Sequence, residues 1–296
     1  MTVTIRHFGK HEIIPANDIM MAAFNSPENR VKDLNRLLEI QPDGWFMASD
    51  DGIPVGTVGA IDYGAFAWIG MMAVNPDKQG GGIGKKLMQV LLDWLESHGN
   101  QISLLDATPL GEPLYQRFSF REVDRAVQFV KFGHSPKNEA FLDSVKSGPS
   151  MALQEGIKVM TETDIPDVAK FDSAYFGANR KAVFAVYLHD YPNRAFIAYT
   201  PSGKMGGYIM VQDRKIGPWV AESAEVAERL LHTALTLEYY GEDPAVIAPA
   251  INSRAKKILE KNGFQSVRSL SHMQRGGVAS PIRREFIFGQ TSFAIG

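Results

Sequence analysis

The sequence predicts an α/β protein made of two consecutive units that share one order of strands and helices. Three observations support this prediction. Strand-like and helix-periodic segments alternate along the chain, a glycine-rich turn joins one of these strands to a helix, and the layout of the first half begins again at Ile157. A chain of 296 residues also suits two domains better than one, and its 45% of hydrophobic residues is ordinary for a globular protein.

Within the first half, the elements follow each other in a definite order. The alternation of residues 3–7 predicts an opening strand, and apolar spacing predicts helices from about Asn17 and over residues 31–38. Two strands joined by a turn at Asp50-Asp51-Gly52 come next, and the order then continues as strand, glycine loop, helix, strand, short helix and strand. The corresponding residues are 45–48, 54–61, 68–74, 79–84, 85–98, 102–107, 111–120 and 121–132.

The composition excludes several classes of protein. The formal net charge is −2, which gives no basic footprint for nucleic acid, and no stretch approaches the roughly 20 apolar residues of a membrane helix. The N-terminus lacks the apolar core of a signal peptide. The absence of cysteine excludes disulfides and thiolate chemistry, and the seven histidines lack a metal-binding spacing such as H-E-x-x-H. We therefore expect a cytoplasmic protein with no metal and with neither nucleic acid nor membrane as partner.

The glycine-rich turn is the most informative segment of the chain. A strand that feeds a glycine loop at a helix N-terminus can hold a pyrophosphate, because main-chain N–H groups converge there at the positive end of the helix. A Walker A loop is excluded, since Gln79 and Lys86 stand where it needs a glycine and a hydroxyl. A dinucleotide fingerprint is excluded as well, since its last glycine would fall on Lys85 or Leu87.

The pattern that does fit is Gln-x-x-Gly-x-Gly, formed by Gln79, Gly82 and Gly84 and preceded by Val74-x-Pro76. With its strand and its helix in order, it resembles the coenzyme A loop of the GCN5-related N-acetyltransferase (GNAT) family. Residues 114–120 resemble a second signature of that family, a Leu-Tyr followed by Gly-Phe, although Ser119 replaces the usual glycine. The resemblance covers about residues 3–132. It implies a mixed, mostly antiparallel sheet flanked by helices, with acetyl-CoA as cosubstrate.

The resemblance also implies roles for particular residues. Main-chain groups of Met72, Ala73 and Val74 would hold the pantetheine arm and the acetyl carbonyl, with the Val74 N–H stabilising the oxyanion. Tyr115 would be the general acid that protonates the departing coenzyme A thiolate. Lys85 and Lys86 either add charge for the adenosine phosphates or are solvated lysines at a helix start. The pyrophosphate would lie on the N–H groups of Gln79, Gly80, Gly81, Gly82, Ile83, Gly84 and Lys85.

The general base stays open at this point. Asp106 ends a strand just before Thr108-Pro109, where it is a base, an anchor for the substrate ammonium or a cap for the helix at Gly111. Glu112 lies close by, and a chain of waters needs no single base. The ionisable side chains of the second half either face a cleft or are surface and structural charges; these are Asp172, Arg180, Glu222 and His232. The strand-like segment 285–296 predicts an ordered terminus, whose carboxylate is a further candidate base.

The second half repeats the layout without the chemistry. Val74 and Phe120 are 46 residues apart, and Val220 and Phe264 are 44 apart. Residues 221–225, with two glutamates and no glycine, replace the loop and would repel a pyrophosphate. Counting back from Phe264, Leu259 stands where the first half has Tyr115. The second unit should therefore not bind coenzyme A.

The sequence thus predicts a catalytic acetyltransferase domain over residues 1–132, a linker over 133–156 and a degenerate domain over 157–296. The expected reaction moves an acetyl group from acetyl-CoA to a primary amine, of a small molecule rather than a protein tail, by direct attack. The alternative is a non-catalytic acyl-CoA sensor. A homodimer is the default among oligomers.

Overall fold

A computed structural model describes residues 3–134, 154–277 and 281–296 of the chain. The chain forms two compact units, and neither is one continuous stretch of sequence. Unit 1 contains Met1–Val123, Leu270–Pro281 and Phe293–Gly296, whereas unit 2 contains Asp124–Ser269 and Ile282–Ser292. The halves of the sequence therefore exchange segments, which the expected division at residues 132 and 157 does not include. Most of the expected linker lies outside the described residues.

Unit 1 contains six strands of a mixed sheet, with helices packed on them. The strand order is β1-β2-β3-β4-β5-β12, and every neighbouring pair is antiparallel except β4 and β5, which are parallel. The elements are β1 (Val3–His7), α1 (Ile13–Phe24), α2 (Val31–Ile40), β2 (Trp45–Asp50), β3 (Ile53–Asp62), β4 (Ala67–Val74), α3 (Ile83–Ser97), β5 (Ser103–Ala107), α4 (Glu112–Gln116) and β12 (Gln265–Arg275), the last from Leu270 onward.

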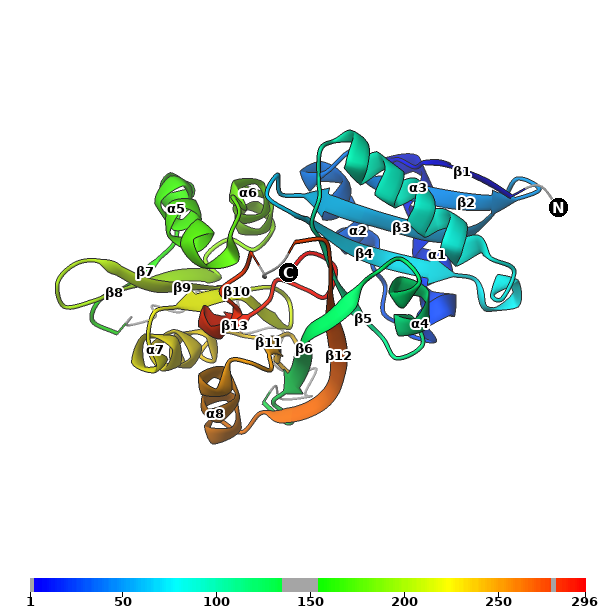
Figure 1. Ribbon diagram of the computed structural model, residues 1–296. Coiled ribbons are helices and arrows are strands. Elements are labelled where there is room, and N and C mark those ends of the chain that lie inside the picture. Colours follow the sequence, from blue (N-terminus) through cyan, green and yellow to red (C-terminus); the bar gives the residue numbers. More distant parts are fainter. Residues whose placement is uncertain (1–2, 135–153, 278–280) are drawn as a thin grey trace. The chain divides into compact units, whose positions relative to one another are not determined.

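Helix α3 is the element that the glycine loop introduces. Leu87, Leu91 and Leu95 recur at helical spacing and are buried against the sheet in one hydrophobic cluster with Ile69 and Leu105. Figure 1 shows α3 on one face of strands β2–β4, with α1 and α2 on the other. Both faces of the central strands are therefore covered, and the start of α3 lies at the carboxyl end of β4.

Unit 2 repeats this architecture with the continuation of the same strand order, β6-β11-β10-β9-β8-β7. Neighbouring strands are antiparallel except β10 and β11, and the short strand β13 pairs with β10. The elements are β6 (Arg121–Val130) from Asp124 onward, β7 (Ile157–Val159), α5 (Ile165–Phe176), α6 (Lys181–Asp190), β8 (Ala195–Tyr199), β9 (Met205–Val211), β10 (Lys215–Ala221), α7 (Ala224–Ala234), β11 (Ala245–Pro249), α8 (Ser253–Lys261) and β13 (Ile287–Gly289).

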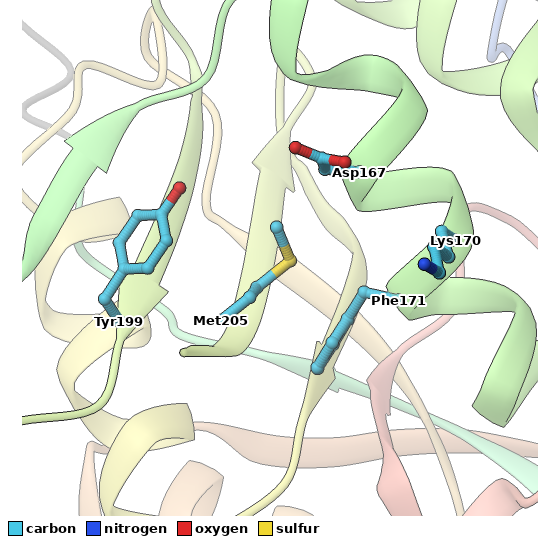
Figure 2. Close-up of a pocket in the computed structure, with 5 residues that line it drawn as sticks. All are labelled: Asp167, Lys170, Phe171, Tyr199 and Met205. Atoms are coloured by element: carbon cyan, nitrogen blue, oxygen red, sulfur yellow. The ribbon is translucent and has the colours of Figure 1, made fainter. Parts of the chain in front are cut away.

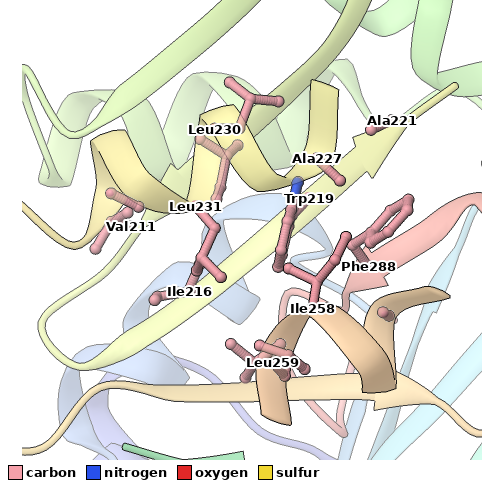
Figure 3. Packing of buried hydrophobic residues seen from close by; sticks show 14 of the residues in the cluster. Val211, Ile216, Trp219, Ala221, Ala227, Leu230, Leu231, Ile258, Leu259 and Phe288 are labelled. Atoms are coloured by element: carbon pink, nitrogen blue, oxygen red, sulfur yellow. The ribbon is translucent and has the colours of Figure 1, made fainter. Parts of the chain in front are cut away.

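The core of unit 2 lies where α7, α8 and β13 meet the sheet. Trp219 of β10 is fully buried there and stacks against Phe288 of β13, with ring centroids 5.2 Å apart. Leu230 of α7 and Leu259 of α8 belong to the same cluster (Figure 3). This core does not depend on the first half of the sequence for its helices, which explains why the repeat is visible in the sequence pattern.

One strand of each half pairs with strands of the other half. Strand β6 ends the first half of the sequence, but it pairs with β11 of unit 2 over five residues, Ala245 opposite Val130 to Pro249 opposite Ala126. Strand β12 comes from the second half and pairs with β5 of unit 1, with Ser271 opposite Ala107 and Arg275 opposite Ser103. The strands of each unit therefore include one from the other half of the sequence.

The predicted fold class is confirmed, and most predicted elements appear within a few residues of their expected ends. The strand-like reading of residues 285–296 is wrong beyond its first part. A 3₁₀ turn at Arg284–Phe286 precedes the three-residue strand β13, and the residues after Gly289 form no strand. Alternation alone predicted a strand there, but the segment finds a strand partner over only these few residues.

Within residues 3–134, 154–277 and 281–296, no helix combines the length and the apolar character that are needed to cross a membrane.

Candidate active site

The glycine loop of unit 1 has the backbone geometry that its sequence predicts. The 3₁₀ turn Pro76–Lys78 follows β4, and the Lys78 Nζ is 2.8 Å from Asp50 Oδ2 at the end of β2. Gly80 and Gly82 have φ angles of +79° and +81°, which are favourable only for glycine. Both glycines are exposed, and a Cβ at either would meet no atom within 4 Å. The requirement for glycine is therefore conformational at these two positions.

The start of α3 presents free main-chain donors at this loop. The first hydrogen bond of the helix runs from the Lys86 N–H to the Gly82 carbonyl over 3.1 Å. The N–H groups of Ile83, Gly84 and Lys85 precede it, and they therefore lie in the first turn, where helix donors have no intrahelical acceptor. The positive end of the helix dipole adds to the attraction for an anion. A pyrophosphate is the kind of group that this terminus can bind.

A different constraint acts on Gly84. A Cβ at this position would be 3.3 Å from Leu114 Cδ2 on α4, which is tighter than most real contacts. The glycine lets α4 pack closely against the first turn of α3. Since Tyr115 follows Leu114 directly, this contact brings the candidate acid towards the same end of the helix.

Strand β4 contains a β-bulge just before its carboxyl end. Gly59 pairs with Gly70 and Thr57 pairs with Ala73, so that one residue of β3 faces two residues of β4. Met71 has a φ of +54°, which is unusual for a residue with a side chain. The buried Thr57 Oγ1 donates a hydrogen bond of 2.9 Å to the Met71 carbonyl and stabilises this conformation.

Beyond the bulge, one edge of β4 has no strand beside it. The parallel pairing of β4 with β5 ends at Ile69 opposite Leu105, although β4 continues to Val74. The Asn75 N–H donates to the Val55 carbonyl of β3, and Ala73 pairs with Thr57. Because main-chain groups alternate along a strand, those of Met72 and Val74 face away from β3, towards the side that β5 has left. We call this stretch, residues 70–74 of β4 and 106–107 of β5, the β4–β5 notch.

Gln79 has a structural role in this arrangement. Its Nε2 donates a hydrogen bond of 3.0 Å to the Val74 carbonyl. The side chain therefore ties the loop to the end of β4, which the sequence pattern did not indicate. Met72, Val74 and the loop donors of residues 80–85 consequently lie at one corner of unit 1.

Tyr115 is buried at this corner with an unused hydroxyl. The ring is 8% exposed and belongs to the hydrophobic cluster that contains Ile83 and Leu87 of α3. Its edge packs near Phe120, with centroids 6.0 Å apart. Among the described residues, none hydrogen-bonds to the Tyr115 hydroxyl. Burial raises the pKa of Tyr115 above its ordinary value, so the phenol holds its proton at neutral pH.

The second signature is intact in its geometry despite its departure in sequence. Ser119 adopts a φ of +64°, the left-handed conformation in which the usual glycine of this signature is unstrained. The positive φ is less favourable for serine than for glycine, and it occurs at a turn that places Phe120 in the core.

Asp106 does not cap the helix at Gly111, and that candidate role is wrong. The N-terminus of α4 has no side-chain cap. Asp106 Oδ1 is instead 2.8 Å from Nδ1 of His272 on β12, and neither side chain is exposed to solvent. Asp106 is the first residue of β5 beyond its last pair with β4, so the two side chains lie where the notch begins. Sequence reasoning missed His272, because it is 166 residues away in the chain.

In unit 2 the corresponding place is filled by the chain itself. Strands β10 and β11 pair at Ile216–Val246 and then separate, as β4 and β5 do. Strand β13 pairs with β10 in the space that follows, and the Gln290 N–H donates to the Ile247 carbonyl of β11 over 2.8 Å. The main chain of residues 287–290 therefore occupies the edges of β10 and β11, whereas the corresponding edges of β4 and β5 in unit 1 have no strand between them among the residues that the structure describes.

The helix start of unit 2 also lacks the donors of a phosphate site. The Ser223 hydroxyl accepts a hydrogen bond from the Val226 N–H and caps α7. The Glu222 carboxylate accepts one of 2.8 Å from the Tyr175 hydroxyl. Leu259, which stands where unit 1 has Tyr115, is fully buried in the hydrophobic core.

The remaining candidate charges of the second half are not gathered around a site. Asp172 and Arg180 form a buried ion pair inside unit 2, with side chains 0% and 1% exposed, so they do not face a cleft. His232 is half-exposed on α7 beside Asn262.

In unit 1, Glu112 is partly buried in the first turn of α4, and Lys85 and Lys86 are exposed on α3.

A surface depression of about 390 Å³ lies in unit 2, away from the glycine loop and the β4–β5 notch of unit 1. It is lined by Phe171 and the residues around it on α5 and the β8–β9 hairpin (Figure 2), namely Asp167, Lys170, Tyr199 and Met205. None of these is a residue that the sequence assigned to chemistry. In the described part of the chain, no cluster of three or more His, Cys, Asp or Glu side chains is placed to hold a metal ion.

Comparison with protein families agrees with this geometry. A model described as the acetyltransferase (GNAT) family matches residues 15–120, which include the loop, Asp106 and Tyr115. A second model, described as an acetyltransferase (GNAT) domain, matches residues 168–289. Two copies of one fold are therefore recognised, and their positions agree with the repeat in the sequence.

Individual relatives extend over most of the chain. Holothin acyltransferase from Pseudoalteromonas sp. (strain SANK 73390) is 24% identical over 249 residues, which cover 82% of this chain and 79% of the relative. A solved structure from Pyrococcus horikoshii, described as an acetyltransferase, has a TM-score of 0.83 at 26% identity and covers 99% of this chain and 96% of its own. A GCN5-related N-acetyltransferase from Sphaerobacter thermophilus, with a TM-score of 0.65 at 15% identity over 95% and 98%, shows the fold alone.

Proposed function

Because the chain belongs to the GNAT family of acyltransferases, we propose that unit 1 transfers an acetyl group from acetyl-CoA to a primary amine of a small molecule. The observation that carries the proposal is the corner where the β4–β5 notch meets the glycine loop. It combines first-turn donors of α3 at residues 83–85 with main chain at Met72 and Val74 that faces away from β3. The donors suit a pyrophosphate, and the strand edge suits the amides of a pantetheine arm.

The chemistry follows from these groups. The amine attacks the thioester carbon, and the Val74 N–H donates to the oxygen that becomes negative, which is worth about 3–4 kcal/mol for one donor in other acyl transfers. As the C–S bond breaks, Tyr115 gives its proton to the sulfur. The phenol suits this step because burial keeps it protonated and the hydroxyl has no competing partner among the described residues.

Direct attack fits this corner better than a covalent acyl-enzyme. The chain has no cysteine, and no side chain assigned to the site is a nucleophile activated by a base. Asp106 lies at the start of the notch, where its carboxylate is paired with His272. The relative's name, holothin acyltransferase, supports acyl transfer and leaves the acceptor of this chain to be found. The near-neutral charge of the chain favours a small amine over a basic protein tail.

A binding measurement tests the loop directly. Titration calorimetry with acetyl-CoA should give about one equivalent per chain for the unaltered protein. Gly82→Glu should abolish binding, since it places a carboxylate in the anion site and a side chain at a φ of +81°. Gly203→Glu is a matched control, because Gly203 has a φ of +77° and equally open surroundings on a turn of unit 2. Loss of binding in both variants, or no binding by the unaltered protein, would refute the proposal.

A turnover measurement separates the enzyme from a sensor that binds acyl-CoA without reaction. With a panel of primary amines, Tyr115→Phe should lower kcat by about 10²–10⁴-fold and leave the affinity for acetyl-CoA unchanged. Tyr239→Phe is the control, because it removes the hydroxyl of another buried tyrosine, in unit 2. A sensor would show no turnover with any amine and no effect of either substitution on binding.

A further inference from the structure

We infer that His272, held by Asp106, is the proton acceptor that converts the substrate ammonium of unit 1 into the attacking amine. The inference rests on the proposed acyl transfer and assigns a role to a residue of the exchanged strand β12. An amine must lose a proton before it can attack a thioester, and neither the Val74 N–H nor the protonated Tyr115 phenol can accept it.

The position of the pair supports this role. Asp106 and His272 are directly opposite each other on β5 and β12. Asp106 follows Leu105, the last residue of β5 that pairs with β4, and the residue beside it on β4 is Gly70. Met72, whose main chain faces the notch, is two residues further along β4. The pair therefore lies at the closed end of the notch in which the thioester is proposed to bind.

The pair also lies on the face of the sheet opposite to α3. Leu105 and Met273 belong to the hydrophobic cluster under α3. Their neighbours Asp106 and His272 point to the other face, because side chains alternate along a strand. There the His272 ring is 5.1 Å from the Trp68 ring of β4. An amine that approaches from this face would meet the thioester from the side opposite to the pyrophosphate helix.

Two other polar side chains of this part of β12, Ser271 and Arg275, point away from the imidazole. Ser271 Oγ donates to Glu122 Oε2 over 2.5 Å, and Arg275 pairs with Glu96 of α3. Ser271 and Arg275 are both an odd number of residues from His272, so their side chains lie on the α3 face. On its own face, His272 pairs with Asp106 of β5. The terminal segment of the chain packs near it, since the Trp68 indole N–H donates to the Phe293 carbonyl and Ala294 lies against Gly70.

The chemistry of the contact defines the basic atom. Nδ1 of His272 is 2.8 Å from Asp106 Oδ1, so a neutral imidazole donates its Nδ1 proton to the carboxylate. The basic nitrogen is then Nε2. When Nε2 takes a proton, the imidazolium faces a carboxylate, which makes a positive charge tolerable where both side chains are 0% exposed. Triads of carboxylate, imidazole and substrate use the same division of roles.

The proton balance of the reaction then closes. The ammonium gives one proton to Nε2 of His272, and the free amine forms the N–C bond. The C–S bond breaks, Tyr115 protonates the sulfur, and the phenolate takes the second proton from the amide-forming nitrogen. The products are the N-acetyl amine and coenzyme A with its thiol, and His272 leaves the cycle as an imidazolium that releases one proton to solvent.

The tautomer of His272 is the first test, and it needs no substrate. Nitrogen-15 NMR of the imidazole rings, with His272→Asn used to assign the signal, should show a neutral ring protonated on Nδ1. A ring protonated on Nε2 would overturn the inference, because its basic nitrogen would then face Asp106 and could accept no proton from a substrate.

The second test is kinetic. An asparagine at position 272 keeps an N–H donor for Asp106 but cannot accept a proton, so a structural role predicts full activity. The inference predicts that His272→Asn lowers kcat/KM by about 10²–10⁴-fold near neutral pH, for the fastest amine of the panel. The loss should shrink by about tenfold per pH unit as the solution itself supplies the free amine. His232→Asn, on the exposed face of α7, is the control.

The outcomes separate this inference from the proposed function. If the unaltered protein neither binds acetyl-CoA nor acetylates any amine, the proposed function fails. If it does both, and His272→Asn binds acetyl-CoA and turns over normally, the inference alone is overturned. A loss of activity that is the same at every pH would also overturn it. Such a loss would indicate a distorted site, whose activity does not recover when a higher pH supplies more of the unprotonated amine.

Discussion

The buried ion pair of unit 2 allows a stability prediction with a defined magnitude. Asp172 of α5 accepts hydrogen bonds from Arg180 Nη2 at 2.7 Å, from Arg180 Nε at 2.9 Å and from the Tyr208 hydroxyl at 2.6 Å. The guanidinium also lies 3.7 Å from the centre of the Phe176 ring. With side chains 0% and 1% exposed, the two charges depend on each other for compensation.

Replacement of one partner should therefore cost much more than an ordinary hydrogen bond. In Asp172→Asn, an amide N–H₂ would face the guanidinium and the positive charge would stay buried. We expect the free energy of unfolding of unit 2 to fall by about 3–5 kcal/mol. Tyr208→Phe removes one hydrogen bond and leaves the ion pair intact, so it should cost about 1–2 kcal/mol. The double substitution Asp172→Leu/Arg180→Met should recover most of the loss, since no charge remains buried.

The four tryptophans make the assay specific for one unit. Trp219 lies in unit 2, whereas Trp45, Trp68 and Trp94 lie in unit 1. With 5-fluorotryptophan incorporated, the fluorine NMR signal of Trp219 in a urea titration reports the unfolding of unit 2 by itself. A decrease of less than about 1 kcal/mol for Asp172→Asn would refute the reasoning, because it would mean that the pair is worth no more than a surface ion pair.

Two further predictions concern buried polar groups of both units. The indole N–H of Trp219 has no hydrogen-bond partner in the described residues, whereas that of Trp45 donates to a carbonyl. In urea titrations, Trp45→Phe should therefore lower the free energy of unfolding by about 1–2 kcal/mol more than Trp219→Phe does. Equal losses in the two variants would contradict this prediction. Burial and Glu222 raise the pKa of Tyr175 to about 12, so the stability that its neutral form contributes is present below about pH 10 and lost as the pH rises towards 12. Glu222→Gln should lower that pKa, measured by carbon-13 NMR of the Tyr175 ring, and an unchanged titration would show that the carboxylate does not contribute.

Local sequence determined much of unit 1, because the signals lie close together in the chain. The helix predicted over residues 85–98 is α3, in which Leu87, Leu91 and Leu95 recur at helical spacing, and it ends at Ser97. The turn at Asp50-Asp51-Gly52 was predicted from residue type, and Asp51 and Gly52 have the positive φ angles of such a turn. The positive φ angles of Gly80 and Gly82 follow the same logic, since a loop that needs them leaves few alternatives to glycine.

Contacts between distant segments could not be predicted in this way. The alternation of residues 265–275 indicates which side chains share a face, but it is the same whichever strand lies beside them. Only the folded chain decides that β12 pairs with β5 and so brings His272 to Asp106. For the same reason, Asp172 and Arg180 were readable as cleft residues until their burial against Tyr208 was known.

The sequence by itself determined the order of elements, the tandem repeat and the loop at the end of β4, because each is a pattern along the chain that does not require knowing which segments meet in space. Tertiary structure decided which strands complete each unit, that β13 fills the place in unit 2 that stays unpaired in unit 1, and that an imidazole faces Asp106. The alternation of side chains along a strand has a period of two residues, and it does not specify which other strand pairs with it. The choice of partner is therefore made by the packing of whole faces, which no local pattern contains.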